Sequence, residues 1–266
     1  PSKAGPRVMR FDFHDTTEGW RISEVNSDVP GGFVEGDGFT RLMSEACGGA
    51  PPPGFPARRL AEALVNGGAE PNPTVAFVHA SAYSDDRQVP AFLAREAELL
   101  GARPMLVDPS QIRWTNEGRA DIETEWFQGR ADAVHRFFPA EWLPNLRRTC
   151  AWPKYFAGGS TPQCNPGWAL ISQSKRFGML LPRLRTPMPV WRKLLPETRD
   201  VREVARAHES EWVFKPALGR VGEGIGMAGI TSSKQWQEIR RSLFFFPARS
   251  IAQRRFEMLP MHTDSA

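Results

Sequence analysis

Apolar and polar residues alternate near the start of the chain, and this period of two predicts a strand hairpin over residues 8–28. Further along, three short apolar runs at 74–80, 103–108 and 131–138 are typical of buried strands. The amphipathic stretch 88–102 predicts a helix between the first two runs. This β–α–β order with short links indicates a parallel, Rossmann-like unit.

Helical and turn signals divide the rest of the chain. Residues 33–65 have a helical pattern that is broken by the Gly- and Pro-rich stretch 48–56. A second Gly/Pro-rich stretch, 158–167, marks a boundary before the last part of the sequence. The whole pattern predicts an α/β protein with α+β elements. Beyond the boundary we expect helices at 172–184, 200–208 and 232–243, and strands at 212–217 and 251–259.

The composition of the 266-residue chain, with 41% hydrophobic and 24% charged residues, is that of an ordinary globular protein. No apolar run approaches the roughly 18 residues of a membrane span, and the first residues lack the apolar core of a signal peptide. They also lack an initiator Met, so we expect a processed chain or a piece of a longer protein. The net charge of +4 is spread without a basic stripe, which argues against nucleic acid as a partner.

The three cysteines, Cys47, Cys150 and Cys164, are odd in number and lack the spacing of metal ligands. A reduced, cytoplasmic protein is the simplest interpretation, with these cysteines as packing residues. The aromatic run Phe244–Phe246 is expected to lie in the core at the end of a helix.

Polar side chains gather on one face of the predicted hairpin. If the turn centres on Glu18, Asp12 lies opposite Glu24. Arg10 then lies opposite Asn26, and the period of two points all four side chains to the same face. Two opposed carboxylates repel unless a hard cation lies between them, and the amide adds a neutral oxygen. The set predicts a Mg²⁺ site that also holds substrate phosphates, with the arginine placed to clamp a phosphoryl or carboxylate group.

The other face of the hairpin, with Phe11, Phe13 and Val25, is expected to face a core. Ser27 and Asp28 follow the hairpin directly, where a substrate could reach them. A second interpretation of the polar face stays open, in which it is a solvated surface with a cross-strand Arg–Glu pair.

A glycine-rich stretch, Lys215–Met227, follows the strand expected at 212–217. Its glycines let the backbone approach a ligand and offer N–H groups to phosphate, while Lys215 supplies a point charge at the strand end. The order of residues fits neither a P-loop nor a dinucleotide-binding fingerprint, and a flexible hairpin tip is the alternative. Lys175, near the start of an expected amphipathic helix, would by itself be a surface lysine.

Together, RFDF…SEVNSDVPGG, RFFPAEWLPNL, SQSKRFGMLLPRL, VFKPALGRVGEGI and IAQRRFEMLP resemble the glutathionylspermidine synthase-like proteins, the circularly permuted branch of the ATP-grasp ligases. The resemblance runs from about Arg10 to Pro260. As in that branch, the carboxylate hairpin precedes the lysines. The resemblance implies a circularly permuted ATP-grasp-like fold. Its expected parts are a metal-binding hairpin part at 1–50, a Rossmann-like pre-ATP-grasp unit at 51–150 and a nucleotide-binding lobe at 151–266.

The resemblance also implies roles for single residues. Asp12, Glu24 and Asn26 match the Mg²⁺ ligands. Arg10 matches the arginine that stabilises the transition state of acyl-phosphate formation. The matches to the ATP-binding residues are Lys175 and Lys215 at the phosphates, Gly219, Gly222 and Gly224 in the mobile loop over the triphosphate, and Gln253 near the adenine.

The activity implied by the resemblance is that of an ADP-forming carboxylate–amine ligase with ATP and Mg²⁺ as cofactors. Its substrates would be a small-molecule carboxylate and an amine, with neither nucleic acid nor a membrane as partner. The family carries one more strand with a phosphate-binding arginine, so we expect a missing C-terminal segment or a partner chain to complete the site. The alternatives are a non-catalytic ATP-binding accessory or degenerate ATP-grasp protein and, third, an interaction module without nucleotide.

Overall fold

The computed structural model describes residues 5–50, 54–68, 71–220 and 222–260. By its internal contacts the chain divides into two compact units. No helix within the described ranges is both long enough and apolar enough to cross a bilayer. The first unit comprises Pro1–Arg10 and Asn26–Leu170, and the second comprises Phe11–Val25 and Ile171–Ala266.

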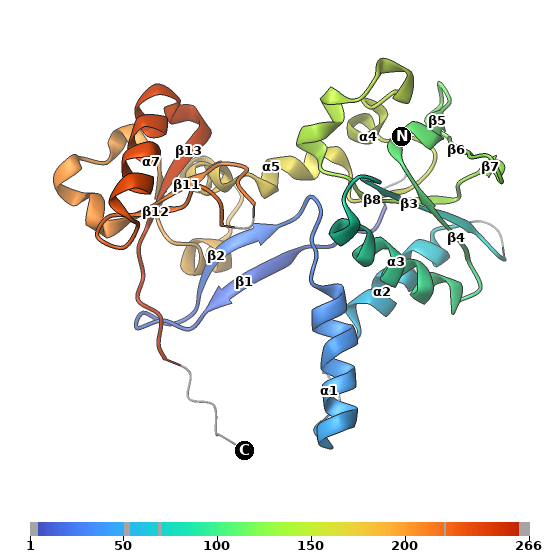
Figure 1. Cartoon of the computed structure of the whole chain (residues 1–266), viewed down its shortest axis with the longest axis horizontal. Helices are drawn as coiled ribbons and strands as arrows, with labels where there is room; N and C mark the ends of the chain where they lie inside the picture. Colours follow the sequence, from blue (N-terminus) through green and yellow to red (C-terminus); the bar gives the residue numbers. More distant parts are fainter. Residues whose placement is uncertain (1–4, 51–53, 69–70, 221, 261–266) are drawn as a thin grey trace. The chain divides into compact units, whose positions relative to one another are not determined.

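The first unit is built on a four-stranded parallel sheet (Figure 1). Its strands are β4 (Arg103–Val107), β3 (Thr74–His79), β8 (Ala133–Phe137) and β9 (Gln163–Cys164), in that spatial order. Helix α3 (Ser84–Glu98) connects β3 to β4. The predicted β–α–β unit and its third strand are therefore confirmed, and the protein is of mixed α/β class with a parallel sheet.

Both faces of this sheet are covered, which explains why every residue of β3 is buried. Val75 and Phe77 point to a core that also contains α3 and α2 (Pro56–Asn66), seen together below the sheet in Figure 1. The alternate residues Ala76 and Val78 pack into a second core on the other face. A strand buried on both sides reads as a continuous apolar run, as this segment does.

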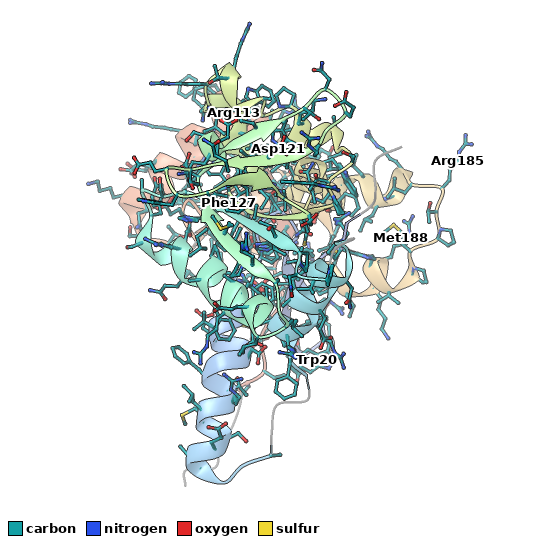
Figure 2. The ribbon with its side chains drawn as sticks, turned by 90° about the vertical axis from the view of Figure 1, so that its right-hand side faces the viewer. Trp20, Arg113, Asp121, Phe127, Arg185 and Met188 are labelled. Carbon is teal, nitrogen blue, oxygen red and sulfur yellow. The ribbon has the colours of Figure 1, made fainter. Side chains whose placement is uncertain are left out.

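The second core is closed by a small antiparallel sheet that the sequence did not reveal. Its strands are β5 (Ile112–Trp114), β6 (Ala120–Glu123) and β7 (Gln128–Arg130). Arg113 and Asp121, labelled in Figure 2, are register partners on β5 and β6. Strands of three or four residues are too short for a period of two to stand out.

The predicted helical region 33–65 and its break are confirmed. Helix α1 (Thr40–Cys47) ends at Gly48, whose φ of 65° suits a residue without a Cβ. Residues 51–53, inside the break, lie outside the described part of the chain. The remaining short helices up to residue 173 are η1 (Val34–Phe39), η2 (Pro109–Gln111), η3 (Ala140–Asn145), η4 (Arg148–Cys150), α4 (Lys154–Ala157), η5 (Gly167–Ala169) and α5 (Leu170–Gln173).

The predicted hairpin is present as β1 (Arg10–His14) and β2 (Arg21–Asn26), which form a two-stranded sheet. Val25 is buried as expected, but Phe11 and Phe13 are 37% and 50% exposed, so their placement in a core was wrong. Strand alternation shows that two residues share a face; it does not show what covers that face.

The second unit also contains an antiparallel sheet of four strands in the order β10-β13-β11-β12. They are β10 (Thr198–Arg199), β11 (Trp212–Pro216), β12 (Gly226–Met227) and β13 (Ser250–Arg254). Helix α7 (Ser233–Phe245) was predicted and lies beside this sheet in Figure 1. The strand expected at 251–259 ends at Arg254, five residues early.

Only one face of this sheet packs on α7. Phe214 and Ala252 are register partners, and both lie in the core with Trp236 of the helix. The residues directly before and after Phe214 on β11, and before and after Ala252 on β13, therefore point to the opposite face. Lys215 and Gln253 lie on that opposite face, beside their apolar register partners Ile251 and Val213.

Other helix predictions in this unit were wrong in type or extent. The segment expected as a helix at 172–184 is mostly the 3₁₀ helix η6 (Lys175–Arg183), capped by Ser174 and containing Pro182. The segment expected at 200–208 forms only the 3₁₀ turns η7 (Val201–Glu203) and η8 (Arg206–Glu211). Helix α6 (Pro189–Leu194) and η9 (Pro247–Arg249) were not predicted. The three phenylalanines expected in the core are exposed: Phe244, Phe245 and Phe246.

Candidate functional site

Lys215 is a buried cation on the face of the second unit's sheet that points away from α7. Its Nζ donates to Gln253 Oε1 at 2.7 Å and to the Ser23 carbonyl at 3.1 Å. Only 8% of the residue is exposed, and burial, helped by the charge of Lys175, lowers the pKa of this ammonium to about 8; Glu24 opposes the shift. A lysine held this way gains from any anion that replaces its neutral acceptors.

Lys175 opens η6, and its side chain is 7% exposed. Its backbone N–H donates to Ala217 O at 2.9 Å, which ties the start of η6 to the end of β11. Its Nζ donates to Glu24 Oε1 at 3.0 Å and to Gly219 O at 2.9 Å. The expectation for this residue taken alone, a surface lysine, was therefore wrong.

Four residues singled out in the sequence thus meet in the second unit, together with the Ser23 carbonyl. We call the set Glu24, Lys175, Lys215 and Gln253 the lysine cluster. Glu24, Lys175 and Gln253 also line a cavity of about 30 Å³. That volume admits a water molecule but not a triphosphate.

The glycine-rich loop touches the cluster through the Gly219 carbonyl. Gly222 and Gly224 have φ angles of 75° and 68°, which side-chain-bearing residues rarely adopt. At Gly224 a Cβ would also lie 2.8 Å from Pro216 Cγ, so this glycine is required by space as well as by conformation. Val221 lies outside the described residues. The loop currently presents a carbonyl oxygen to the lysine.

Asp12 and Glu24 are the two carboxylates of the predicted metal site, and both belong to the second unit. Asp12 is half-buried, and its main-chain oxygen accepts a 3.5 Å hydrogen bond from Ser23 Oγ, which also lies 2.7 Å from His14 Nε2. Across the described ranges, no three His, Cys, Asp or Glu side chains gather into a metal-binding group. The predicted set, two carboxylates and one amide, is an oxygen-only donor set of the kind Mg²⁺ prefers.

Arg10 and Asn26 belong to the first unit, at the outer ends of β1 and β2. The Arg10 side chain runs beside two glycines. A Cβ on Gly32 would lie 3.5 Å from Arg10 Cδ, and one on Gly31 would lie 4.0 Å from Arg10 Nη1. Both distances are ordinary van der Waals contacts, so the Arg10 side chain lies against this turn without depending on the absence of a Cβ. The predicted role of Arg10 remains a prediction.

Ser27 and Asp28 were expected within reach of a substrate, and this was wrong, because both are fully buried. Asp28 Oδ1 accepts from Arg136 Nη2 at 2.5 Å, and its Oδ2 accepts from Ala140 N at 2.9 Å. Ser27 Oγ donates to Ala169 O at 3.0 Å. The two residues hold the chain that leaves the hairpin.

Asn165 is a residue that the sequence did not single out. Its Nδ2 donates to Val8 O at 2.8 Å and to Ser27 O at 2.9 Å, and its Oδ1 accepts from Val8 N at 3.0 Å. One side chain therefore joins the segment that enters the hairpin to the segment that leaves it. The sequence signal that could have indicated this buried polar network is Arg136, because a charged residue inside an apolar strand needs a buried partner.

Comparisons with known proteins agree with this architecture. Residues 5–255 match the family model described as glutathionylspermidine synthase preATP-grasp. A glutathione synthetase-like effector from Globodera pallida, solved in its apo form, superposes with a TM-score of 0.65 at 14% identity. That match covers 96% of this chain but 62% of the effector, so the chain spans less than two thirds of that protein. No curated protein is similar enough in sequence to count as a relative.

Proposed function

Because this chain belongs to the glutathionylspermidine synthase preATP-grasp family, we propose that it acts as an ATP-dependent carboxylate–amine ligase. In this proposal the fold is a circularly permuted ATP-grasp, with the hairpin part at 1–50, the pre-ATP-grasp unit at 51–150 and the nucleotide lobe at 151–266. The single observation that supports it most is the lysine cluster, in which the buried ammonium group of Lys215 donates to Gln253 and Ser23 O while that of Lys175 pairs with the carboxylate of Glu24.

The proposed reaction has two steps, a phosphoryl transfer to the substrate carboxylate and then an acyl transfer to the amine. A substrate carboxylate oxygen attacks the γ-phosphorus of ATP, which gives an acyl phosphate and ADP. An amine then attacks the acyl carbon, the bond from that carbon to the phosphate oxygen breaks, the nitrogen gives up one proton to the released phosphate or water, and an amide remains. The protein's part in such transfers is positioning and charge neutralisation rather than covalent catalysis.

The lysine cluster would supply most of the positive charge for this reaction. Lys175 donates to Glu24 and Gly219 O, and Lys215 donates to Gln253 and a carbonyl. Phosphate oxygens would replace neutral acceptors at Lys215 and would compete with the Glu24 carboxylate at Lys175. Arg10 would stabilise the transferring phosphoryl group. Gln253 would bind near the adenine.

Mg²⁺ would be held by Asp12, Glu24 and Asn26, and it supplies neutralisation of phosphate charge when bound. Glu24 is the link between the two predicted sets, because it already contacts Lys175. If phosphate oxygens replaced Glu24 as the partner of the Lys175 ammonium group, the Glu24 carboxylate would lose its counter-charge, and Mg²⁺ would supply a new one.

Amine-dependent release of ADP tests this function. Lys215→Met and Lys175→Met should each reduce the rate at least about a hundredfold, since each removes a buried charge aimed at phosphate. Asp12→Asn and Glu24→Gln should abolish the Mg²⁺-dependent rate with the fold intact. Lys234→Met, at an exposed position on α7, is the matched control. ADP release that survives in the two lysine variants as well as in the control contradicts the proposal.

A second candidate is an ATP-binding protein without ligase activity, because the lysine cluster would bind phosphate groups by charge whether or not an amine substrate is bound. Such a protein would bind Mg-ATP, and at 100 times the dissociation constant the nucleotide would add about 2.7 kcal/mol of stability. It would release no ADP when amines are supplied. Thermal shift and ADP release measured on one sample therefore separate the two candidates.

A further inference from the structure

The second unit contains a cavity of about 820 Å³ that has no part in the proposed reaction. Residues 176–183 of η6 and the segment 195–200 supply most of its lining, and we call it the η6 pocket. None of the four residues of the lysine cluster is among the described residues that line it. Small molecules bind in pockets of roughly 300–1,000 Å³, so this cavity has the size of a ligand site.

The 3₁₀ conformation of η6 places a row of side chains along this pocket. A 3₁₀ helix has three residues per turn, so Phe177, Leu180 and Arg183 lie one above the other, and all three line the pocket. A rise of about 2.0 Å per residue puts the first and last Cα of the row about 12 Å apart. Leu195 and Pro196 add to the apolar lining. The row therefore runs from an aromatic ring through an aliphatic side chain to a cation.

Arg192 of α6 brings a second cation to the same end of η6. Its Nη2 donates to the Leu184 carbonyl at 3.3 Å, and Leu184 follows Arg183 directly in the chain. Within the described ranges, neither Arg183 nor Arg192 forms an ion pair. Each guanidinium carries about five N–H donors, so most of them are available to a ligand in the pocket.

The carboxylates that line the pocket do not neutralise these two cations. Glu197 pairs with Arg199, and Asp200 accepts hydrogen bonds from Arg202 at 2.8 and 2.9 Å. Glu203 is exposed, where water and salt screen its charge. The end of the pocket that holds the two arginines is therefore complementary to an anion.

We propose that the η6 pocket binds a small amphipathic anion, a carboxylate carried on an aliphatic or aromatic body. Arg183 and Arg192 bind the carboxylate through charge-assisted hydrogen bonds. Phe177, Leu180 and Leu195 remove the apolar body from water, which is the main source of affinity for such a group. None of these residues has a part in the proposed ligase reaction, so the inference stands whether or not the chain hydrolyses ATP.

Isothermal titration of the whole chain in the absence of nucleotide tests the site. The two probes are octanoate, with an aliphatic body, and hydrocinnamate, with an aromatic one. We expect at least one of them to bind, and the tighter one identifies the body that the pocket prefers. Its neutral amide should bind at least about tenfold more weakly because it loses the charged contacts, and acetate should do so because it lacks the apolar body.

Variants assign the anion to the two arginines. In Arg183→Gln/Arg192→Gln the carboxylate probe should bind at least about tenfold more weakly than in the unchanged protein, and no more tightly than its amide. Arg183→Lys/Arg192→Lys keeps both charges and should keep the preference for the carboxylate. Arg185→Gln is the matched control, because Arg185 lies in the exposed loop between η6 and α6 (Figure 2) and is not among the described residues that line the pocket.

Four results would overturn the inference. The first is that neither octanoate nor hydrocinnamate binds. The second is an amide or acetate that binds as tightly as the carboxylate probe, which would mark a bare apolar surface or a bare anion site. The third is a glutamine double variant that prefers the carboxylate as strongly as Arg185→Gln does. The fourth is a lysine double variant that loses this preference as completely as the glutamine one, which would show that charge is not what binds the probe.

Discussion

Replacement of Asp28 by alanine should destabilise the protein more than almost any other single change. Both side chains of the Asp28–Arg136 pair are fully shielded from solvent. Asp28→Ala leaves the guanidinium in the interior without its counter-charge and removes the acceptor of the Ala140 N–H. Loss of one partner of a buried ion pair costs about 3–5 kcal/mol. That is a large part of the roughly 5–15 kcal/mol by which a domain is stable.

Urea unfolding, followed by circular dichroism and by tryptophan fluorescence, measures this cost. Asp121→Ala is the matched control in the same unit, because the Arg119–Asp121 pair also has a short contact, 2.8 Å, but its side chains are 51% and 26% exposed. An exposed pair contributes about 1 kcal/mol or less. The double variant Asp28→Ala/Arg136→Met should cost less than the sum of its two single changes by about 1–3 kcal/mol.

If Asp28→Ala lowers the free energy of unfolding by no more than Asp121→Ala does, then burial does not set the energy of the Asp28–Arg136 pair. If the double variant lowers it by the full sum of the two single variants, then Arg136 is not stabilised by Asp28. Either outcome refutes the view that this pair holds the chain leaving the hairpin.

Three other predictions concern the second unit. In the proposed function ATP binds the charged form of Lys215, whose pKa lies at about 8, so the dissociation constant for ATP should rise about tenfold between pH 7 and pH 9. A dissociation constant for ATP that does not change between pH 7 and pH 9 contradicts the role given to Lys215. Because the pKa of Lys215 is lower in the folded state than in the unfolded state, the free energy of unfolding in urea should rise from pH 8 towards pH 10. Gly224→Ala should destabilise the protein by more than Gly222→Ala, because both need a positive φ but only Gly224 would place a Cβ 2.8 Å from Pro216; equal melting temperatures would argue against this packing. Glu24→Gln should tighten the binding of ATP in EDTA several-fold, since Lys175 loses a competing carboxylate, while Glu45→Gln, on the exposed helix α1, should leave it unchanged; weaker binding in EDTA would show that Glu24 does not compete with phosphate.

The elements that could be predicted from the sequence are those long enough to show a period. β3, α3, β4 and β8 form a unit whose order alone indicates a parallel sheet, and the structure has it. The segment Lys175–Arg183 is as amphipathic as an α-helix, yet it is 3₁₀. Gly178 and Pro182 lie inside it, and at Gly178 a Cβ would lie 2.8 Å from Thr198 Oγ1. Tertiary contact with the sheet edge therefore overrides the pattern, because propensity is only a weak prior.

For the charged residues, the sequence likewise shows that a buried charge needs a partner but does not show which residue the partner is. The rule that a buried charge needs a partner can be applied to Arg136 from its apolar strand alone, but the partner is 108 residues away in the chain. Lys175 and Glu24 are 151 residues apart, and Lys215 and Ser23 are 192 apart. No local pattern relates positions so far apart in the sequence. The sequence therefore shows which charged residues need a partner, but only the fold determines which residue that partner is. The motif resemblance named Glu24 and both lysines without those contacts. Asp28 was placed only by its position after the hairpin and was expected within reach of a substrate, yet it is fully buried.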